Sequence, residues 1–142
     1  MAKKLTHEIY DDIKHARHKI HKLHYKLTGN LLIKGTRYVS TILFYNNDKF
    51  IGYVELIFLK NSVAKIDWIY GPGYGKQIMK IVEKLCKQYN KHYIILNCSI
   101  DPKENVKNVM RRLNFYISLQ YKVYNIKFRK TYGPLLFLQK KI

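Results

Sequence analysis

Residues 68–85, WIYGPGYGKQIMKIVEKL, place three glycines and a proline between an apolar run and a helical pattern. Glycine inside a regular element costs about 0.5–1 kcal/mol relative to alanine, so Gly71, Gly73 and Gly75 need a physical reason. A glycine-rich turn from a strand into a helix exposes backbone N–H groups at the positive end of the helix dipole. The stretch therefore predicts an anion site suited to a phosphate or pyrophosphate, with a purely structural turn as the alternative.

Three strands are expected before this turn. The runs at 37–45, 50–59 and 63–70 are rich in β-branched and aromatic residues, which favour extended structure. Because the segments between them are short, the strands are predicted to form an antiparallel meander. A helix over 75–90 should follow the turn, since its apolar residues recur on one face: Ile78, Ile81, Val82, Leu85 and Tyr89.

The C-terminal third alternates between strand and helix signals. A buried strand is predicted over 93–100, followed by a helix with Asp101 as its N-cap, Glu104 in a capping box and a stop at Asn114. This helix is expected to face the core with Val106, Val109, Met110 and Leu113. The chain, 1–142, is expected to be a single domain that ends in strands near 115–119, 122–129 and 135–139.

The N-terminal segment 6–27 is predicted to be one amphipathic helix with Thr6 as its N-cap. Only MAKKL precedes it, so the sheet is expected to lack a first strand. The segment carries a histidine at every third position: His15, His18, His21 and His24. At about 100° per residue these side chains fan across the solvent side, so a basic solvated face is preferred over a metal site.

Two cysteines, Cys86 and Cys98, are too few for a disulfide framework and are expected to be buried thiols. The longest apolar runs fall far short of the ~20 residues that a membrane span needs. The N-terminus turns polar at once, without the apolar core of a signal peptide. These features predict an intracellular, cytoplasmic protein that does not associate with membranes.

The net charge of +18 favours acidic partners such as nucleic acid. Coding bias is the alternative explanation, because the residues of AT-rich codons are abundant and lysine outnumbers arginine 22 to 5. Readers of base edges and phosphates favour the planar fork of arginine. If the charge serves nucleic acid, the surface expected to bind it is the polar side of 6–27, around Lys14, His18 and Lys22.

Two known phosphate-binding motifs do not fit the glycine-rich turn. The P-loop needs G-x-x-x-x-G-K-[ST], but the spacing from Gly71 to Gly75 is one residue too short and Gln77 stands where a hydroxyl is needed. The dinucleotide fingerprint G-x-G-x-x-G belongs to a parallel βαβ unit, whereas the strands here are predicted to be antiparallel.

The stretch YGPGYGKQIM resembles the acetyl-CoA loop of the Gcn5-related N-acetyltransferases (GNAT), whose motif is Q/R-x-x-G-x-G/A. The match places Tyr70 at the Q/R position, Gly73 at the middle glycine and Gly75 at the last one. FIGYVEL and AKIDWIY resemble the third and fourth strands of that family. YIILNCSI followed by DPKENVKNVMRRLNF resembles its fifth strand and fourth helix. The resemblance covers most of the chain and implies an α/β (α+β) fold with a mixed, mostly antiparallel sheet flanked by helices.

The resemblance implies acetyl-CoA as the cofactor, with its pyrophosphate held by backbone N–H groups of the loop. Carried over to this sequence, the pyrophosphate contacts are Gly71, Gly73, Tyr74, Gly75 and Lys76, and the residues near the pantetheine arm are Ile69 and Tyr70. The tyrosine that often serves as general acid in the family corresponds to Met110.

Acetyl transfer to an amine needs the neutral amine, yet an alkylamine titrates near pH ~10.4, so a base must accept a proton. Asp67 and Glu55 are the carboxylates within strands that border the expected cleft, and Asp67 is preferred. An ion pair with one of the many cations is the alternative role for either. Because the leaving thiol has a pKa near ~8.5, an acid is less essential, and Tyr116, Tyr121 or Tyr124 could substitute for Met110.

Two functions follow from these observations. The first is an acetyl-CoA-dependent N-acetyltransferase that acts on a small-molecule or protein amine, as a monomer or homodimer. The second is a catalytically weak or inactive GNAT-like basic module that binds nucleic acid or an acidic partner.

Overall fold

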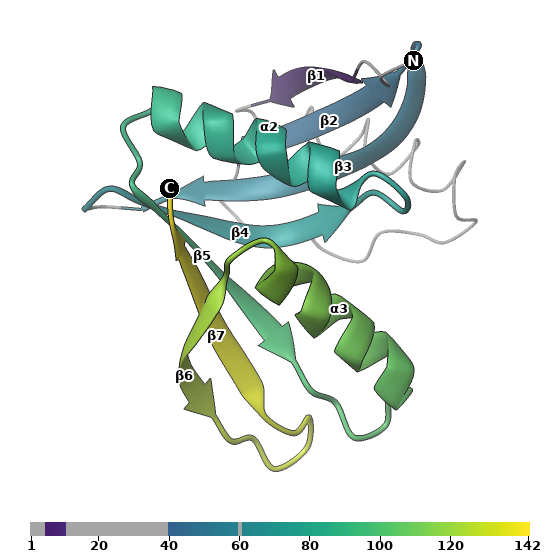
Figure 1. The fold of residues 1–142 in the computed structure, drawn as a ribbon, viewed down its shortest axis with the longest axis vertical. Helices are drawn as coiled ribbons and strands as arrows, with labels where there is room; N and C mark the ends of the chain where they lie inside the picture. Colours follow the sequence, from purple (N-terminus) through teal and green to yellow (C-terminus); the bar gives the residue numbers. More distant parts are fainter. Residues whose placement is uncertain (1–4, 11–39, 60) are drawn as a thin grey trace. The chain divides into compact units, whose positions relative to one another are not determined.

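The structure of the protein, a computed structural model, describes residues 5–10, 40–59 and 61–142. Its elements in chain order are β1 (Leu5–Tyr10), β2 (Ser40–Asn46), β3 (Lys49–Phe58), β4 (Val63–Tyr70), α2 (Gly75–Gln88), β5 (Tyr93–Ser99), α3 (Val106–Ser118), β6 (Lys122–Lys127) and β7 (Leu135–Lys141) (Figure 1). The strands form a mixed sheet in the order β1-β2-β3-β4-β5-β7-β6, which confirms the predicted fold class. Contacts divide the chain into two compact units, the first made of described residues of 1–58 and of 66–81, the second of 59–65 and 82–142.

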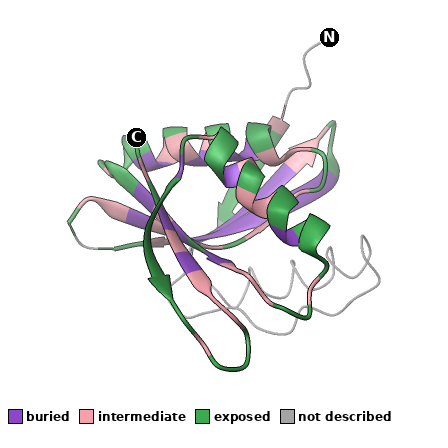
Figure 2. Cartoon of the chain, turned by 60° about the horizontal axis from the view of Figure 1, so that its bottom comes forward, coloured by how far each residue is buried: buried purple, intermediate pink, exposed green. Residues whose placement is uncertain are grey.

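The first unit is built on an antiparallel meander in which β1 pairs with β2 and β2 pairs with β3. The β2–β3 hairpin turns at Asn47 and Asp48, whose φ angles of 49° and 64° are those of a two-residue primed turn. Apolar residues along β2 and β3 are buried, as Figure 2 shows by colour. A cluster of Leu43, Phe50 and Tyr53 forms part of this core.

The N-terminal strand corrects one prediction. The structure has β1 at Leu5–Tyr10, where the sequence predicted no first strand and a helix beginning at Thr6. The strand pairs residue by residue with β2, from Leu5 opposite Asn46 to Tyr10 opposite Thr41, and the His7 ring lies 6.2 Å from that of Phe44. Pairing with β2 along the whole segment outweighs the local helical pattern of these residues. Residues 11–27, with the four histidines and the lysines of the expected basic face, lie outside the described residues.

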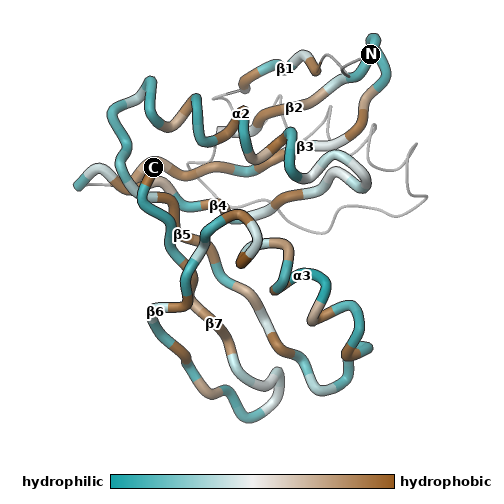
Figure 3. The backbone as a smooth tube through the Cα atoms, viewed as in Figure 1, coloured by the Kyte–Doolittle hydropathy of each residue, from teal (hydrophilic) through white to brown (hydrophobic). Residues whose placement is uncertain are grey.

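The second unit joins β5, β7 and β6 by antiparallel pairing and adds α3. Leu96 and Cys98 on β5 and Leu136 and Leu138 on β7 are buried, so these strands share one apolar face. The predicted strands at 93–100 and 135–139 are confirmed as β5 and β7, and that at 122–129 as β6. Hydropathy alternates along α2 and α3, as expected for amphipathic helices (Figure 3).

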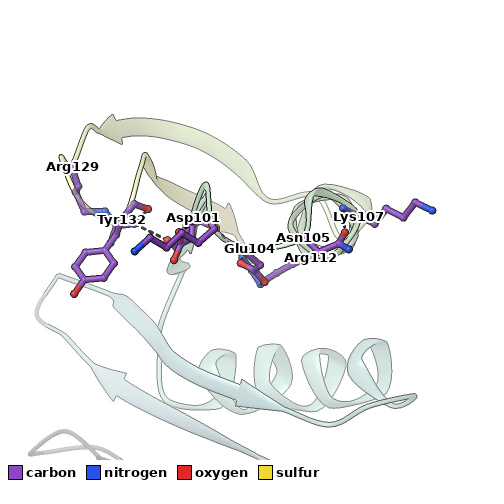
Figure 4. Close-up of polar contacts among 9 residues, drawn as sticks. Asp101, Glu104, Asn105, Lys107, Arg112, Arg129 and Tyr132 are labelled. Atoms are coloured by element: carbon purple, nitrogen blue, oxygen red, sulfur yellow. Dashed lines mark hydrogen bonds and ion pairs between the residues drawn. The ribbon is translucent and has the colours of Figure 1, made fainter.

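Helix α3 begins four residues later than predicted. Its N-cap is Asn105, whose Oδ1 accepts from the Lys107 N–H at 2.8 Å, while the Asp101 carboxylate only closes a turn with the Lys103 N–H (Figure 4). Glu104 forms no capping box, because both its carboxylate oxygens accept from Arg112 at 2.9 Å. This guanidinium lowers the pKa of Glu104, and its Nη2 also donates to the Ser99 carbonyl.

The helix also runs past Asn114 to Ser118, through the strand predicted near 115–119. Burial favours the extension, since Tyr116 lies within it, is buried and packs against Tyr121 with ring centroids 6.0 Å apart. The prediction that Val106 and Met110 face the core is wrong: they are 74% and 46% exposed.

Both cysteines are buried and free, as the sequence predicted. Burial raises the pKa of the Cys86 thiol to about 12, so almost no thiolate forms at neutral pH. We expect a thiol reagent such as DTNB to react with neither cysteine of the folded protein at pH 8 within minutes, and with both after unfolding in guanidinium. Rapid release of two equivalents from the native protein would contradict the burial of these side chains.

Candidate functional site

The connection from β4 to α2 is a tight turn over residues 71–74. The Gly71 carbonyl accepts from the Tyr74 N–H at 3.0 Å, and the Tyr74 carbonyl accepts from the Ile78 N–H at 2.9 Å. The second bond is the first one of the helix, which makes Tyr74 its N-cap residue. Tyrosine has no short side-chain oxygen that can reach back to cap the first turn.

The N-terminus of α2 is therefore prepared for an external acceptor. The N–H groups of Gly75, Lys76 and Gln77 precede the first helical hydrogen bond and have no acceptor within the helix. None of the first-turn residues is acidic, and exposed Lys76 places a cation where a helix ordinarily favours an anion. Charge and dipole both favour an anionic ligand at this end.

The glycines of this region serve two different purposes. Gly73 has φ +83°, a conformation that side chains rarely adopt, and no described atom lies within 4 Å of where its Cβ would be. A ligand can therefore approach the backbone at Gly73. At Gly71, by contrast, a Cβ would meet the Ile78 side chain at 2.3 Å, so the missing side chain lets the turn close on the helix.

Gly52 on β3 lies against the end of β4, where the chain enters the glycine-rich turn. A Cβ on Gly52 would lie 2.1 Å from the Tyr70 carbonyl oxygen and 2.7 Å from the Gly71 Cα. Only glycine allows this close approach of β3 to the end of β4. This role of Gly52 was not predicted from the sequence, although an isolated glycine inside a strand pattern is the signal for it.

Side chains from β2 and β4 hold the turn in place. The Tyr74 hydroxyl accepts from the Asn46 Nδ2 at 3.0 Å, which ties the turn to the end of β2. The Tyr70 ring packs on the core cluster, 6.0 Å from that of Tyr53. No local sequence pattern indicates this role of Asn46, because its partner is 28 residues away.

The two carboxylates proposed as bases differ in burial. Asp67 on β4 is half-buried, whereas Glu55 on β3 is only 6% exposed and lies opposite Thr41. Alternation along β4 places Asp67 on the same face as Ile69, and both belong to the first unit with the glycine-rich turn. Both carboxylates have interaction partners in the structure. Asp67 is the more accessible of the two.

The tyrosines considered as acids lie in the second unit and differ in environment. Tyr116 and Tyr121 are buried, which raises the pKa of both, that of Tyr116 to about 12. Tyr124 is exposed on β6. Proton transfer from a phenol with a pKa of about 12 to the thiolate of a thiol with a pKa near ~8.5 is unfavourable. Neither buried tyrosine is therefore an effective acid for that thiolate.

Among the residues that the structure describes, no group of three His, Cys, Asp or Glu side chains is placed to hold a metal ion. Within the same part of the chain, no helix is long and apolar enough to cross a membrane.

Comparison with solved structures identifies the fold. An acetyltransferase from Bacillus subtilis in complex with CoA aligns with a TM-score of 0.68 at 11% identity, covering 98% of this chain and 99% of that one. A GNAT-family acetyltransferase from Elizabethkingia anophelis with acetyl-CoA bound gives 0.66 at 13% identity, covering 97% and 98%. The ribosomal-protein-S18-alanine N-acetyltransferase from Escherichia coli gives 0.66 at 10% identity, covering 96% and 94%.

No protein-family model and no curated protein matched the sequence. The structural likeness nevertheless extends over nearly the whole chain, and the protein has the fold of the GNAT superfamily. The resemblance drawn from the glycine-rich turn is confirmed at the level of the fold.

Proposed function

We propose that the protein is an acetyl-CoA-dependent N-acetyltransferase. The observation that carries the proposal is the β4–α2 turn of a GNAT fold, where helix N–H groups without an acceptor inside the helix, Lys76 and the open backbone at Gly73 come together. Two solved structures with the same fold hold CoA or acetyl-CoA. A pyrophosphate carries the charge and the acceptor oxygens that such a turn favours.

The turn residues differ in what they would supply to the cofactor. Gly73, Gly75 and Lys76 would donate their N–H groups to the pyrophosphate, and Lys76 would add its positive charge. Gly71 and Tyr74 would shape the turn, since the Tyr74 N–H is already bonded to the Gly71 carbonyl. Gly71 and Tyr74 are included among the proposed binding residues because they would contact the pyrophosphate.

The pantetheine arm would lie along Ile69 and Tyr70 at the end of β4. Because the Tyr70 ring packs on the core of the first unit, its backbone would form the contact. Half-buried Ile69 would supply apolar surface.

Asp67 is proposed as the base that accepts the proton of the attacking amine, with Glu55 as the second candidate. The half-buried carboxylate of Asp67 is more accessible to an acceptor than Glu55, which is buried. Direct attack of the amine nitrogen on the thioester carbonyl forms the amide and releases the thiolate. With a pKa near ~8.5, the thiolate can leave without an acid, which accommodates Met110 at the position of the usual tyrosine. The acceptor would be a small-molecule or protein amine, and the protein a monomer or a homodimer.

Acetyl-CoA is expected to raise the melting temperature of the purified protein. At a hundredfold excess over Kd the stabilisation is about 2.7 kcal/mol, or about 8 °C for a chain of this size. Gly73→Asn should abolish the shift, because asparagine tolerates a positive φ but fills the space beside the backbone. Differential scanning fluorimetry measures the shift in melting temperature for the unmodified protein and for Gly73→Asn.

Pro72→Ala is the matched control, since it alters the exposed neighbour in the same turn and should keep the shift. The cofactor proposal fails if the unmodified protein shows no shift at millimolar acetyl-CoA. A shift that persists in Gly73→Asn would place the ligand elsewhere.

A catalytically weak or inactive basic module is the second candidate function, favoured by the exposed Met110 in place of a tyrosine and by the net charge of +18. Release of free thiol from acetyl-CoA separates the two. An active enzyme releases thiol faster with primary amines present, whereas the module binds CoA or an acidic partner without turnover.

A further inference from the structure

The charge of the chain is divided unevenly along the sequence. All nine acidic residues lie at or before Glu104, while residues 105–142 contain nine Lys and Arg and no acid. AT-rich coding raises lysine throughout a chain, but it does not exclude Asp and Glu from one part. This concentration of charge in the second unit indicates an anionic partner there.

Lysines of this region alternate along the chain with exposed aromatic residues on β6 and in the turn that follows it. The six residues are Lys122, Tyr124, Lys127, Phe128, Lys130 and Tyr132, named here the β6 surface. Every residue of β6 is exposed, as is seen along the whole strand in Figure 2. Phe128 is 80% exposed, Tyr132 60% and Tyr124 48%, although burial of such rings would stabilise a monomer.

The turn that carries Tyr132 is held in a defined shape. Arg129 donates to the Gly133 carbonyl at 2.9 Å and to the Ser99 hydroxyl at 2.6 Å, with its guanidinium 5.7 Å from the centre of the Tyr132 ring (Figure 4). Gly133 has φ +70°, and a Cβ there would meet the Ile100 carbonyl oxygen at 2.3 Å. These contacts hold the turn against the end of β5 and place the Tyr132 ring near the Arg129 guanidinium.

Addition of a strand from a second copy does not suit this edge. The Asn125 Oδ1 accepts from the Ile126 N–H at 2.9 Å, which occupies a backbone donor of the edge strand. A register shift between Val123 and Asn125 and the lysines at both ends of β6 also protect the edge. Two copies would in addition bring together surfaces of the same charge.

We propose that the β6 surface binds single-stranded nucleic acid. Exposed aromatic rings can stack on unpaired bases, and the intervening lysines can neutralise the phosphates between them. A duplex hides the faces of its bases, and an acidic peptide offers charge without flat rings, so neither uses both features. The proposal does not depend on acetyl transfer, because the β6 surface and the β4–α2 turn belong to different units.

The test is fluorescence anisotropy of a labelled 12-nucleotide single strand of mixed sequence, titrated with the full-length protein. Binding is expected at ~50 mM salt and should weaken as salt rises. If three lysines neutralise three phosphates, the slope of log K on log [salt] is about −2 from these contacts alone. A duplex of the same sequence should bind several-fold more weakly at each salt concentration.

Two pairs of variants separate the β6 surface from the net charge. Lys122→Gln, Lys127→Gln and Lys130→Gln combined should make the slope less steep by about two units, whereas Lys84→Gln, Lys87→Gln and Lys103→Gln, with the same loss of charge, should change it little. Phe128→Ala should weaken binding about tenfold without lowering the melting temperature. Val106→Ala, at a residue of similar exposure, should change neither the affinity nor the melting temperature.

Several outcomes would overturn the proposal. They are no binding at ~50 mM salt, equal affinity for the duplex, equal effects of the two lysine triples, and full affinity of Phe128→Ala. Competition by polyglutamate as effective as that by the unlabelled strand would instead assign the surface to an acidic protein.

Discussion

Replacing Gly52 with alanine is expected to destabilise the protein by about 3 kcal/mol or more. The new Cβ would lie 2.1 Å from the Tyr70 carbonyl oxygen, which is backbone and cannot rotate away. β4 must therefore shift from β3 at the point where the chain enters the glycine-rich turn. Urea unfolding followed by circular dichroism measures the loss, and acetyl-CoA should no longer raise the melting temperature of any folded fraction.

Gly73→Ala is the matched control for this variant. Its φ of +83° also disfavours a side chain, but no described atom lies within 4 Å of the new Cβ. The cost should be about 1–2 kcal/mol, the ordinary penalty for a left-handed residue. If the two variants unfold at the same urea concentration, the close approach of β3 to Tyr70 is not what requires glycine at position 52.

Local patterns predicted the middle of the chain well. The strands at β3, β4 and β5 and the helix α2 lie within two residues of their predicted bounds, because period and turn residues agree there. The β4–α2 turn was identified from three glycines and a proline that stand between a strand pattern and a helix pattern. Its chemistry depends on backbone N–H groups, and these follow from local geometry.

The errors arose where a distant partner decides the structure. β1 becomes a strand because β2 offers a ladder more than 30 residues away, and Asn105 caps α3 because Arg112 takes the Glu104 carboxylate. Val106 and Met110 follow a helical period, yet burial depends on what lies beside the helix. The bonds from Asn46 and Arg129 that hold two turns also join residues distant in sequence. The net charge could be counted from the sequence. That aromatic side chains among the C-terminal lysines are exposed could be learned only from the structure.

The largest effect on activity is expected at Asp67, the proposed base. General-base catalysis typically contributes a factor of about 10²–10⁴, so Asp67→Asn should lower kcat/KM for the amine by about that much at pH 7. The side chains are nearly equal in size, so stability should change little. Glu55→Gln is the control, because its carboxylate is buried on β3 and is not the preferred base.

The pH dependence shows whether the lost group handled a proton. Without a base, only the neutral amine reacts, and below its pKa of ~10.4 its fraction rises tenfold per pH unit. The rate of Asp67→Asn should therefore rise about 100-fold from pH 7 to pH 9 and approach that of the unmodified protein, whose profile is flatter. A variant slowed by the same factor at pH 7 and pH 9 would assign Asp67 to positioning and not to proton transfer. If Glu55→Gln instead shows the steep profile, Glu55 is the base despite its burial.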